Sequence, residues 1–283
     1  MSEPLTLHEA AERLGVHYMT AYRYVRHGLL AAEKVGGSWQ VEQSAVDRLM
    51  VERAAPATRD ADGSAARVPW DERFEARLVA GDGMGAWGVV ESALSAGADL
   101  DSVYLDVVSP AMVSIGQRWA DGEFDIAVEH VASGIVTRII GRLGHRFARP
   151  GRARGEIVLG SPVGEEHALP GAMLSDLMRL RGWDVFDLGV NVPPTSFVHA
   201  ASRDEVVAVG ISITSPTHLP AAADACSALR TALPHVMVIA GGRAVTGMDH
   251  AEELGAHGWA ASGAEMHSLI DGWSSNAGAS TSG

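Results

Sequence analysis

Between Trp70 and Arg149, apolar residues recur at helical spacing, which predicts four helices. Pro110 lies inside the third of them and should bend it or occupy its first turn, because proline has no backbone N–H. Helices of this length with short connections are typical of a bundle, which we assign to residues 69–150. The apolar positions that mark the helices are Phe74, Leu78 and Val79; Val89, Val90, Ala93 and Leu94; Val103, Leu105, Val107, Val108, Met112 and Ile115; and Ile126, Val131, Ile135, Ile139 and Leu143.

From Glu156 the pattern changes to short apolar runs, each followed by Gly or Ser and then by a helical stretch. This predicts a parallel sheet that helices cover on both faces, a Rossmann-like α/β domain over residues 151–273. Ligands of such sheets bind at the carboxyl ends of the strands. Residues 274–283 are small and polar and are predicted to be disordered. The predicted strand ends carry residues 161–171, 189–194, 212–217, 241–242 and 262–263.

Residues 1–53 have the pattern of a helix-turn-helix. Thr6 and Glu9 are spaced as a capping box, in which each side chain can satisfy the free backbone N–H of the other. The helix that they begin should end near Gly15, and a second helix is predicted from Tyr18 to Arg26. Two short helices joined by a tight turn with glycine are typical of DNA-binding domains.

The segment after these helices predicts a wing. G-L-L-A-A-E-K-V-G-G-S-W-Q-V reads as two short strands around Gly36-Gly37, followed by a helix from Ser44 to about Arg53. The whole would be a winged helix-turn-helix, an α domain with a small β wing. Residues 54–68 are small and polar, which is the composition of a linker.

Composition limits the classes of function. A content of 47% apolar and 20% charged residues is ordinary for a globular protein, and the single Cys226 excludes an internal disulfide framework and a multi-cysteine zinc site. The net charge of −13 argues against a whole chain that coats nucleic acid, but no Asp or Glu occurs between Arg13 and Ala32, so a local DNA-binding face is possible. Without a long apolar run or a signal pattern, we expect a cytoplasmic protein without membrane contact.

The second helix and the wing carry the candidate DNA contacts. T-A-Y-R-Y-V-R-H-G-L-L resembles the recognition helix of MerR-family and excisionase-like winged regulators, which implies operator DNA as a partner. Arg23 would contact a base edge or a phosphate, and Lys34 a phosphate from the wing. A small helical protein-interaction module is the alternative. The full set of candidate contacts, with tyrosine rings expected at the helix surface, is Tyr18, Thr20, Tyr22, Arg23, Arg26 and Lys34.

The loop after the first predicted strand of the α/β domain carries a candidate metal ligand. It reads S-P-V-G-E-E-H-A-L-P-G, and its Gly160 and Gly164 do not have the spacing of a dinucleotide-binding fingerprint. A neutral imidazole at His167 is a good ligand for a transition metal, and Glu165 can accept its other ring proton and fix the tautomer. A surface histidine without a ligand is the alternative.

This loop resembles the Asp-x-His-x-x-Gly signature of cobalamin-binding domains, with Glu165 in the acidic position and His167 in the ligand position. The resemblance implies that His167 replaces the dimethylbenzimidazole of cobalamin as the lower cobalt ligand and that the nucleotide tail enters the sheet. One departure is that Pro170 stands three residues after His167, and Gly171 follows it. The later residues that match, or that lie at strand ends, are Ser212, Thr214, Gly241, Gly242, Ser262 and Gly263. The two adjacent glycines would allow close approach of the tail.

The predicted bundle carries a second signature. Trp119, nine residues, and then Glu129-His130 resemble CarH and LitR type photoreceptor regulators, which bind adenosylcobalamin between the bundle and the Rossmann-like domain. The resemblance implies that Trp119 caps the upper face beside the adenosyl group, that Glu129 bonds this group and that His130 helps to close the pocket. Core packing for the tryptophan, and a solvated helix face for the other two, are the alternatives. Ala120 departs from the family, because a histidine follows the tryptophan in its best-known members.

The resemblance therefore implies a light-dependent transcriptional regulator, a repressor and not an enzyme. Adenosylcobalamin would be its chromophore, and loss of the adenosyl group in light would change a homo-oligomer, a dimer or tetramer, that binds DNA. One alternative is a cobalamin-dependent methyl carrier or methyltransferase component. Another is a regulator that senses a second pigment in the bundle.

Overall fold

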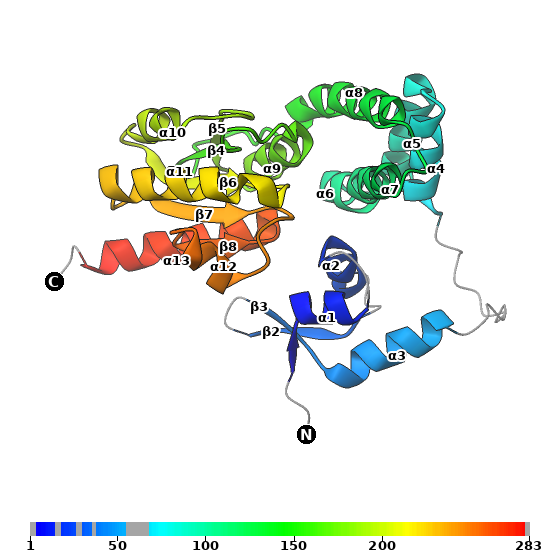
Figure 1. The fold of residues 1–283 in the computed structure, drawn as a ribbon, viewed down its shortest axis with the longest axis horizontal. Coiled ribbons are helices and arrows are strands. Elements are labelled where there is room, and N and C mark those ends of the chain that lie inside the picture. The colour runs from blue at the N-terminus through cyan, green and yellow to red at the C-terminus, as the bar shows by residue number, and fades with distance from the viewer. Residues whose placement is uncertain (1–3, 15–17, 27–29, 36–37, 55–67, 281–283) are drawn as a thin grey trace. The chain divides into compact units, whose positions relative to one another are not determined.

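The computed structural model describes residues 4–14, 18–26, 30–35, 38–54 and 68–280. The chain divides into two compact units, Met1–Arg142 and Leu143–Gly283. An N-terminal helix-turn-helix, a set of longer helices and a C-terminal domain with a parallel sheet follow one another (Figure 1). The predicted fold class is confirmed. The linker predicted at residues 54–68 lies almost wholly outside the described residues.

The N-terminal part begins with the predicted capping box. Thr6 is the N-cap of α1 (Leu7–Arg13), the Glu9 N–H donates to Thr6 Oγ1 at 3.2 Å, and the Thr6 N–H donates to a Glu9 carboxylate oxygen at 2.7 Å. These two bonds satisfy N–H groups that the first turn of a helix leaves free. The remaining elements are β1 (Leu5–Thr6), α2 (Tyr18–Arg26), β2 (Ala32–Val35), β3 (Ser38–Val41) and α3 (Gln43–Ala54).

The wing is an antiparallel hairpin of β2 and β3, in which Val35 pairs with Ser38. The short strand β1 adds to the other edge of β3, giving a sheet of order β1-β3-β2 in the described part of the chain. The sequence predicts the hairpin but not β1, because two residues are too few to carry a recognisable alternation.

The middle part consists of α4 (Trp70–Val79), α5 (Gly83–Ser95), α6 (Leu100–Ser102), a π-helical segment η1 (Val103–Val108), α7 (Ser109–Ala120) and α8 (Ile126–Leu143). The third predicted helix is continuous, but η1 interrupts its α-helical geometry immediately before Pro110. Proline cannot donate to the carbonyl four residues earlier, and a π-helical segment is a common way to accommodate such a break. Fully buried side chains such as Phe74, Leu78, Val90 and Ile115 form its core.

The C-terminal unit is built on a five-stranded parallel sheet of order β5-β4-β6-β7-β8. Its strands are β4 (Glu156–Gly160), β5 (Asp184–Asp187), β6 (Val206–Ser212), β7 (Met237–Gly241) and β8 (Gly258–Ala260). The predicted apolar runs coincide with these strands. The runs on β4, β6 and β7 are mostly buried because helices cover both faces of the sheet, whereas only Val185 is buried on the edge strand β5.

Helices lie on both faces of this sheet (Figure 1). Apolar side chains form a layer between the sheet and the helices on each face. On one face, α10 (Pro194–Ala201), α11 (Leu219–Ala232) and α12 (Met248–Glu253) pack against side chains such as Val209 and Val238. On the other, α9 (Ala168–Leu180) and α13 (Gly263–Ser280) pack against side chains such as Ile157 and Ile239.

The predicted disordered tail is wrong over most of its length, because α13 continues to Ser280. Small residues such as alanine and serine are compatible with a helix once preceding turns have nucleated it, so composition alone misassigned residues 274–280. No helix in the described part of the chain is long and apolar enough to cross a membrane.

Candidate functional site

The loop that joins β4 to α9 lies where the strand order of the sheet reverses. The connection from β4 leads to β5 on one side, and β6 then pairs with β4 on the other side. Loops diverge at such a switch point, which is where open α/β sheets bind their ligands. His167 is the last residue of this loop and the N-cap of α9. The fold thus places the predicted ligand histidine at the expected edge.

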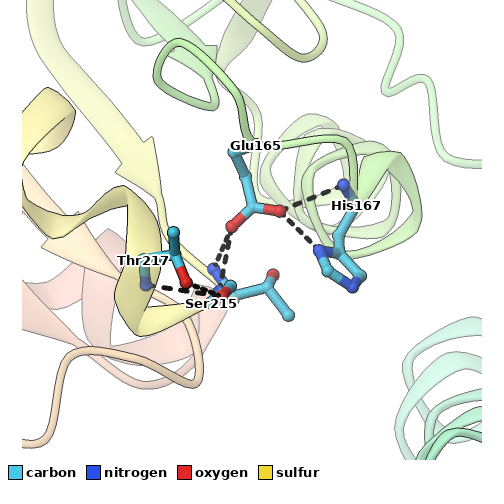
Figure 2. A network of polar contacts seen from close by, with 5 residues as sticks. Glu165, His167, Ser215 and Thr217 are labelled. Carbon is cyan, nitrogen blue, oxygen red and sulfur yellow. Dashed lines mark hydrogen bonds and ion pairs between the residues drawn. The ribbon is translucent and has the colours of Figure 1, made fainter.

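Glu165 is the hub of the loop (Figure 2). One carboxylate oxygen accepts the backbone N–H groups of Thr214 at 2.8 Å and Ser215 at 3.0 Å, both in the loop after β6. The other oxygen accepts the backbone N–H of His167 at 3.2 Å and bonds Nδ1 of the same residue. Because Glu165 is 0% exposed, these bonds replace water around a buried charge.

The pKa of Glu165 is lowered from its ordinary 4.5 to about 2. Burial is the largest single effect and acts to raise this pKa, but the N–H donors of Ser215, the His167 ring, Thr214 and the His167 backbone together outweigh it. Hydrogen bonds to the charged form favour ionisation. Glu165 is therefore a carboxylate at neutral pH, and it requires a proton on Nδ1 of the imidazole that it contacts.

The His167 ring is consequently held with Nε2 as its unprotonated nitrogen when the imidazole is neutral. The side chain is 56% exposed, and Nε2 has no hydrogen-bond partner among the described residues. A neutral imidazole whose tautomer is fixed by a carboxylate is the usual arrangement of a metal-ligating histidine. No group of three or more His, Cys, Asp or Glu in the described residues could hold a metal ion. A single imidazole donor, held in this way, fits a metal whose other ligands come from a cofactor.

Two predicted binding residues, one at the end of β6 and one in the loop after it, differ in their relation to this network. Thr214 contacts Glu165 through its backbone N–H, so its identity is not what makes the bond. Ser212, the last residue of β6, is partly exposed at the carboxyl end of the strand and stays a candidate cofactor contact. Sequence reasoning missed Ser215, because a backbone donor carries no residue signature.

The two adjacent glycines are required by the sheet itself. A β-carbon at Gly241 would lie 2.5 Å from the carbonyl oxygen of Ala260, and one at Gly242 would lie 2.3 Å from that of Ile213. Gly242 also has φ +95°, which favours glycine. The two glycines were predicted to let a nucleotide tail approach closely; in the structure, the group that lies close to each of them is the protein's own backbone.

Ser262 and Gly263 serve the start of α13. The Ser262 hydroxyl accepts the Glu265 N–H at 3.2 Å, and the Glu265 carboxylate accepts the Ala261 N–H at 2.9 Å, so together they cap the helix. A β-carbon at Gly263 would lie 3.3 Å from Leu174 on α9, which indicates close helix packing. These contacts explain both residues without a ligand.

The departure at Pro170 is accommodated in the first turn of α9. Pro170 is the third residue of this helix, where the backbone N–H would have no intrahelical partner. A β-carbon at Gly171 would meet nothing within 4 Å, so the fold does not demand glycine there.

The predicted upper-face residues lie in the other unit, at the end of α7 and the start of α8. Trp119 is 44% exposed and is therefore not a core aromatic. The Glu129 carboxylate accepts a hydrogen bond from the Ser133 hydroxyl at 2.5 Å and bonds His130 Nδ1 at 2.7 Å. The Glu129 side chain is 24% exposed and the His130 side chain 72%. No hydrogen bond or ring contact in the described residues joins the tryptophan to this pair.

The end of α7, which carries Trp119, is held in place by the neighbouring residue Arg118. The guanidinium donates to Glu123 at 2.9 Å and to Glu75 on α4 at 3.0 Å, and it lies 3.9 Å from the centroid of the Phe124 ring. The hydrogen bond that Arg118 donates to Glu123 is the main reason that the pKa of Arg118 is raised. The exposed Trp119 side chain therefore projects from a helix end that Arg118 links to α4.

The candidate DNA contacts are partly corrected. Tyr22 is only 9% exposed and belongs to the core of the helix-turn-helix, so the prediction that its ring lies at the surface is wrong. Ala21, Tyr22 and the partly buried Tyr18 and Val25 form a stripe at helical spacing, which is the face that packs. Lys34 on β2 is exposed, as a wing contact requires. The side chains of Thr20, Arg23 and Arg26 lie outside the described residues.

Comparisons with protein families agree with this division of the chain. A family model described as a B12 binding domain matches residues 155–266, and another of the same description matches residues 70–143. A helix-turn-helix domain model matches residues 4–54. A search of curated proteins finds no match. The chain thus combines the two B12-binding segments with a DNA-binding fold.

Among solved structures, the monomethylamine corrinoid protein of Methanosarcina barkeri has a similar fold, with TM-score 0.65 and 20% identity over 72% of this chain and 98% of that one. A cobalamin-binding protein from Desulfitobacterium hafniense matches with TM-score 0.40 and 23% identity over 71% and 96%. The methanol:cobalamin methyltransferase complex of M. barkeri matches with TM-score 0.41 and 16% identity over 78% and 92%.

The class of protein follows from the fold, the site and these matches. A corrinoid cofactor is indicated by both B12-binding segments and by the donor chemistry of His167. The helix-turn-helix indicates DNA binding. Together they indicate a cobalamin-dependent DNA-binding regulator.

Proposed function

We propose that this protein is a light-responsive transcriptional repressor with adenosylcobalamin as its chromophore, and that it is not an enzyme. The observation that carries the proposal is the exposed His167 imidazole, fixed by a buried carboxylate, in a chain that also has a DNA-binding domain. The choice of adenosylcobalamin rests on the spacing of Trp119 and Glu129-His130 and on their exposure.

In this proposal His167 binds the cofactor through Nε2 as the lower cobalt ligand. Glu165 holds the ring by Nδ1, and because the carboxylate is itself held by Thr214 and Ser215, the imidazole does not need to be ordered when the cofactor arrives. The protein's contribution on this side is therefore a pre-positioned ligand.

In the same proposal, Trp119, Glu129 and His130 would recognise the adenosyl group. An exposed indole offers a large apolar surface, and Glu129 offers carboxylate oxygens to hydroxyl or amine donors. When bound, the cofactor supplies a cobalt–carbon bond that visible light breaks, so these residues lose the group that they recognise. Ala120 has no donor atom, so no histidine next to Trp119 can take the vacated position.

The change in recognition would act on assembly. A homo-oligomer that forms with the adenosyl form positions several helix-turn-helix domains on one operator, and each domain alone contacts few base pairs. A ligand shifts such an equilibrium only by its differential affinity for the two states, which here is the loss of contacts to Trp119 and Glu129. Light would thereby release the DNA.

A mobility-shift assay tests the proposal. A duplex selected from a random library in darkness is incubated with the protein and adenosylcobalamin, before and after green light, with hydroxocobalamin as the cofactor control and His167→Ala as the protein control. We expect a slow-migrating complex only in darkness with adenosylcobalamin. DNA binding that is the same in the light and in the dark would contradict the proposed switch.

A corrinoid methyl carrier is the second candidate, and the fold shared with the M. barkeri monomethylamine corrinoid protein favours it. That likeness leaves more than a quarter of this chain without a counterpart, whereas the helix-turn-helix has an immediate use in a regulator. Under the methyl-carrier reading, cobalamin would bind while DNA binding stayed independent of both cofactor and light. Absorption bands beyond those of cobalamin would instead favour a second pigment.

A further inference from the structure

Asn191 has an unusual backbone for a residue other than glycine. It lies in the loop between β5 and α10, and its φ is +56°. In the described part of the chain it is the only non-glycine residue with positive φ. This left-handed conformation is disfavoured by the β-carbon of an L-residue, although Asn tolerates it better than most. Such positions persist where the surroundings demand them, and they gather at functional sites.

The conformation lets Asn191 bind the loop of His167 at two points. Its side-chain oxygen accepts the Gly164 N–H at 2.9 Å, and its own backbone N–H donates to the Glu165 carbonyl oxygen at 3.1 Å. The two bonds bracket the segment Gly164-Glu165. Neither bond touches His167, so any effect on the imidazole passes through Glu165.

Glu165 is therefore held at both of its ends. Asn191 holds its backbone carbonyl, and the Thr214 and Ser215 N–H groups hold its carboxylate. Its second carboxylate oxygen bonds the His167 ring. If the backbone of Glu165 shifts while Thr214 and Ser215 hold one carboxylate oxygen, the carboxylate turns about that oxygen. The other oxygen, which faces the imidazole, then moves, and the direction of Nε2 changes with it.

Gly164 in this loop also lies close to the His218 side chain. A β-carbon at Gly164 would lie 2.9 Å from Nδ1 of His218. Gly164 also has φ +85°, so the loop already uses a conformation that glycine adopts without strain. Asn191 thus binds a segment whose Gly164 also lies close to the His218 side chain.

A glycine at position 191 would adopt the same φ without strain but would lack the acceptor oxygen. Asp and Asn are the residues that combine tolerance of this conformation with a short side-chain oxygen. The chain carries the more strained choice and uses the oxygen. We propose that Asn191 is a positioning residue that orients His167 toward the cobalt, an inference that rests on the proposed ligand role of His167.

The test measures how much of the cobalt is bound by histidine. Full-length protein labelled with ¹⁵N-histidine is reconstituted without oxygen with cob(II)alamin and studied by electron paramagnetic resonance. An axial ¹⁵N nucleus gives doublets, whereas the unlabelled ¹⁴N of the cofactor's own base gives triplets. The ratio of the two signals reports the histidine-bound fraction in the parent, Asn191→Gly, Asn191→Ala, Asn191→Asp and the control Thr195→Ala.

Thr195 is a matched control because it lies close in sequence, on α10, is exposed and makes no bond to the His167 loop. We expect the parent, Asn191→Asp and Thr195→Ala to give mainly doublets. Asn191→Gly should lower the ratio about threefold to tenfold, the range of one net hydrogen bond. Asn191→Ala should lower it at least as much, because it also disfavours the backbone conformation. Thermal unfolding of Asn191→Gly, which keeps the backbone unstrained, checks that the fold is intact.

The outcomes separate this inference from the proposed function. Triplets in the parent would show that His167 is not the ligand, and the proposed function would fail with it. Doublets in the parent and the same ratio in every variant would overturn the role of Asn191 alone. An Asn191→Asp ratio as low as that of Asn191→Ala would also overturn it, because the acceptor oxygen would then have no effect.

Discussion

The His167 loop and the end of α7, which carries Trp119, hold the two sets of proposed cofactor contacts, but they are built differently. In the loop, Glu165 is fully buried and is bonded by groups 49 and 50 residues away in the sequence. At the end of α7 and the start of α8, Trp119 and His130 are largely exposed, and Glu129 bonds its neighbour and a residue four positions on. Contacts between distant segments therefore hold the His167 loop, whereas only local contacts hold the Glu129 side chain.

Under the proposed function, this difference would separate permanent binding of the cofactor from recognition of its state. A ligand that must hold cobalt in every state gains from a rigid, charge-assisted network, because less freedom is lost on binding. Groups that detect whether an adenosyl moiety is present must be open to it, and their contacts must be easily exchanged. Only the side chains are open in this way, because Arg118 bonds Glu75 on α4 and so holds the backbone at the end of α7.

The largest effect should follow from Glu165→Gln. A glutamine cannot accept from all the donors that surround Glu165, and it carries no charge, so the variant loses the stabilisation that the lowered pKa represents. The shift from 4.5 to about 2 corresponds to roughly 3 kcal/mol in the free energy of unfolding at neutral pH. Urea unfolding of the cofactor-free protein at a series of pH values measures it.

The pH dependence has a definite sign. Because the pKa of Glu165 is lower in the folded state, its contribution is complete above about pH 4.5 and is lost as the pH falls toward 2. The difference between parent and Glu165→Gln should therefore shrink over this window and nearly vanish at its lower end. A difference that stays constant from pH 6 to pH 2 would mean that the charge of Glu165 does not stabilise the loop. The exposed Glu166→Gln, one residue away, is the control.

The comparison also shows what the sequence could predict. The Thr6-Glu9 capping box, the two-residue hairpin and the apolar strand runs are local patterns, and the structure contains all of them. The spacing of Glu165 and His167 was equally local, and their bond is present. The backbone donors of Thr214 and Ser215 were not predictable, because every residue except proline carries the same N–H.

The missed features share a physical cause. The burial of Tyr22, the left-handed backbone of Asn191 and the real neighbours of Gly241 and Gly242 depend on which distant segments meet. From residue type alone, the tyrosine is expected at the surface, the asparagine in a loop of ordinary conformation, and the two glycines beside a ligand. Tertiary packing decides each case, so only the fold could correct them.

A smaller effect on stability, with a clear effect on recognition, should follow from Trp119→Ala. The indole is 44% exposed, so its truncation should lower the free energy of unfolding by about 1 kcal/mol, well below the 3–5 kcal/mol typical of buried tryptophan. The preference of the Trp119→Ala variant for adenosylcobalamin over hydroxocobalamin should be lower than that of the parent by up to about tenfold, the range of one aromatic contact. Equilibrium titration with both cofactors in darkness measures this preference.

The exposed Val113 on the same helix provides the control for Trp119. Val113→Ala removes apolar surface of similar exposure, 37%, and should leave the preference between the two cofactors unchanged. If Val113→Ala reduces it as much as Trp119→Ala, general loosening of α7 is the cause, and the indole has no specific role.

The smallest effect should follow from Ser133→Ala, which bears on how loosely the proposed adenosyl contacts are held. The Ser133 hydroxyl donates to Glu129 at 2.5 Å, and its loss leaves the carboxylate with His130 as its partner in the described residues. One partly exposed hydrogen bond is worth about 0.5–1 kcal/mol, so the adenosyl preference should fall roughly twofold to fivefold. Ser92→Ala on α5 is the matched control, because the Ser92 hydroxyl donates to a backbone carbonyl and both substitutions raise helix propensity equally. A Ser133→Ala loss as large as that of Trp119→Ala would mean that Glu129 is held by a network as strict as that of Glu165, and the contrast between the two sets of contacts would not stand.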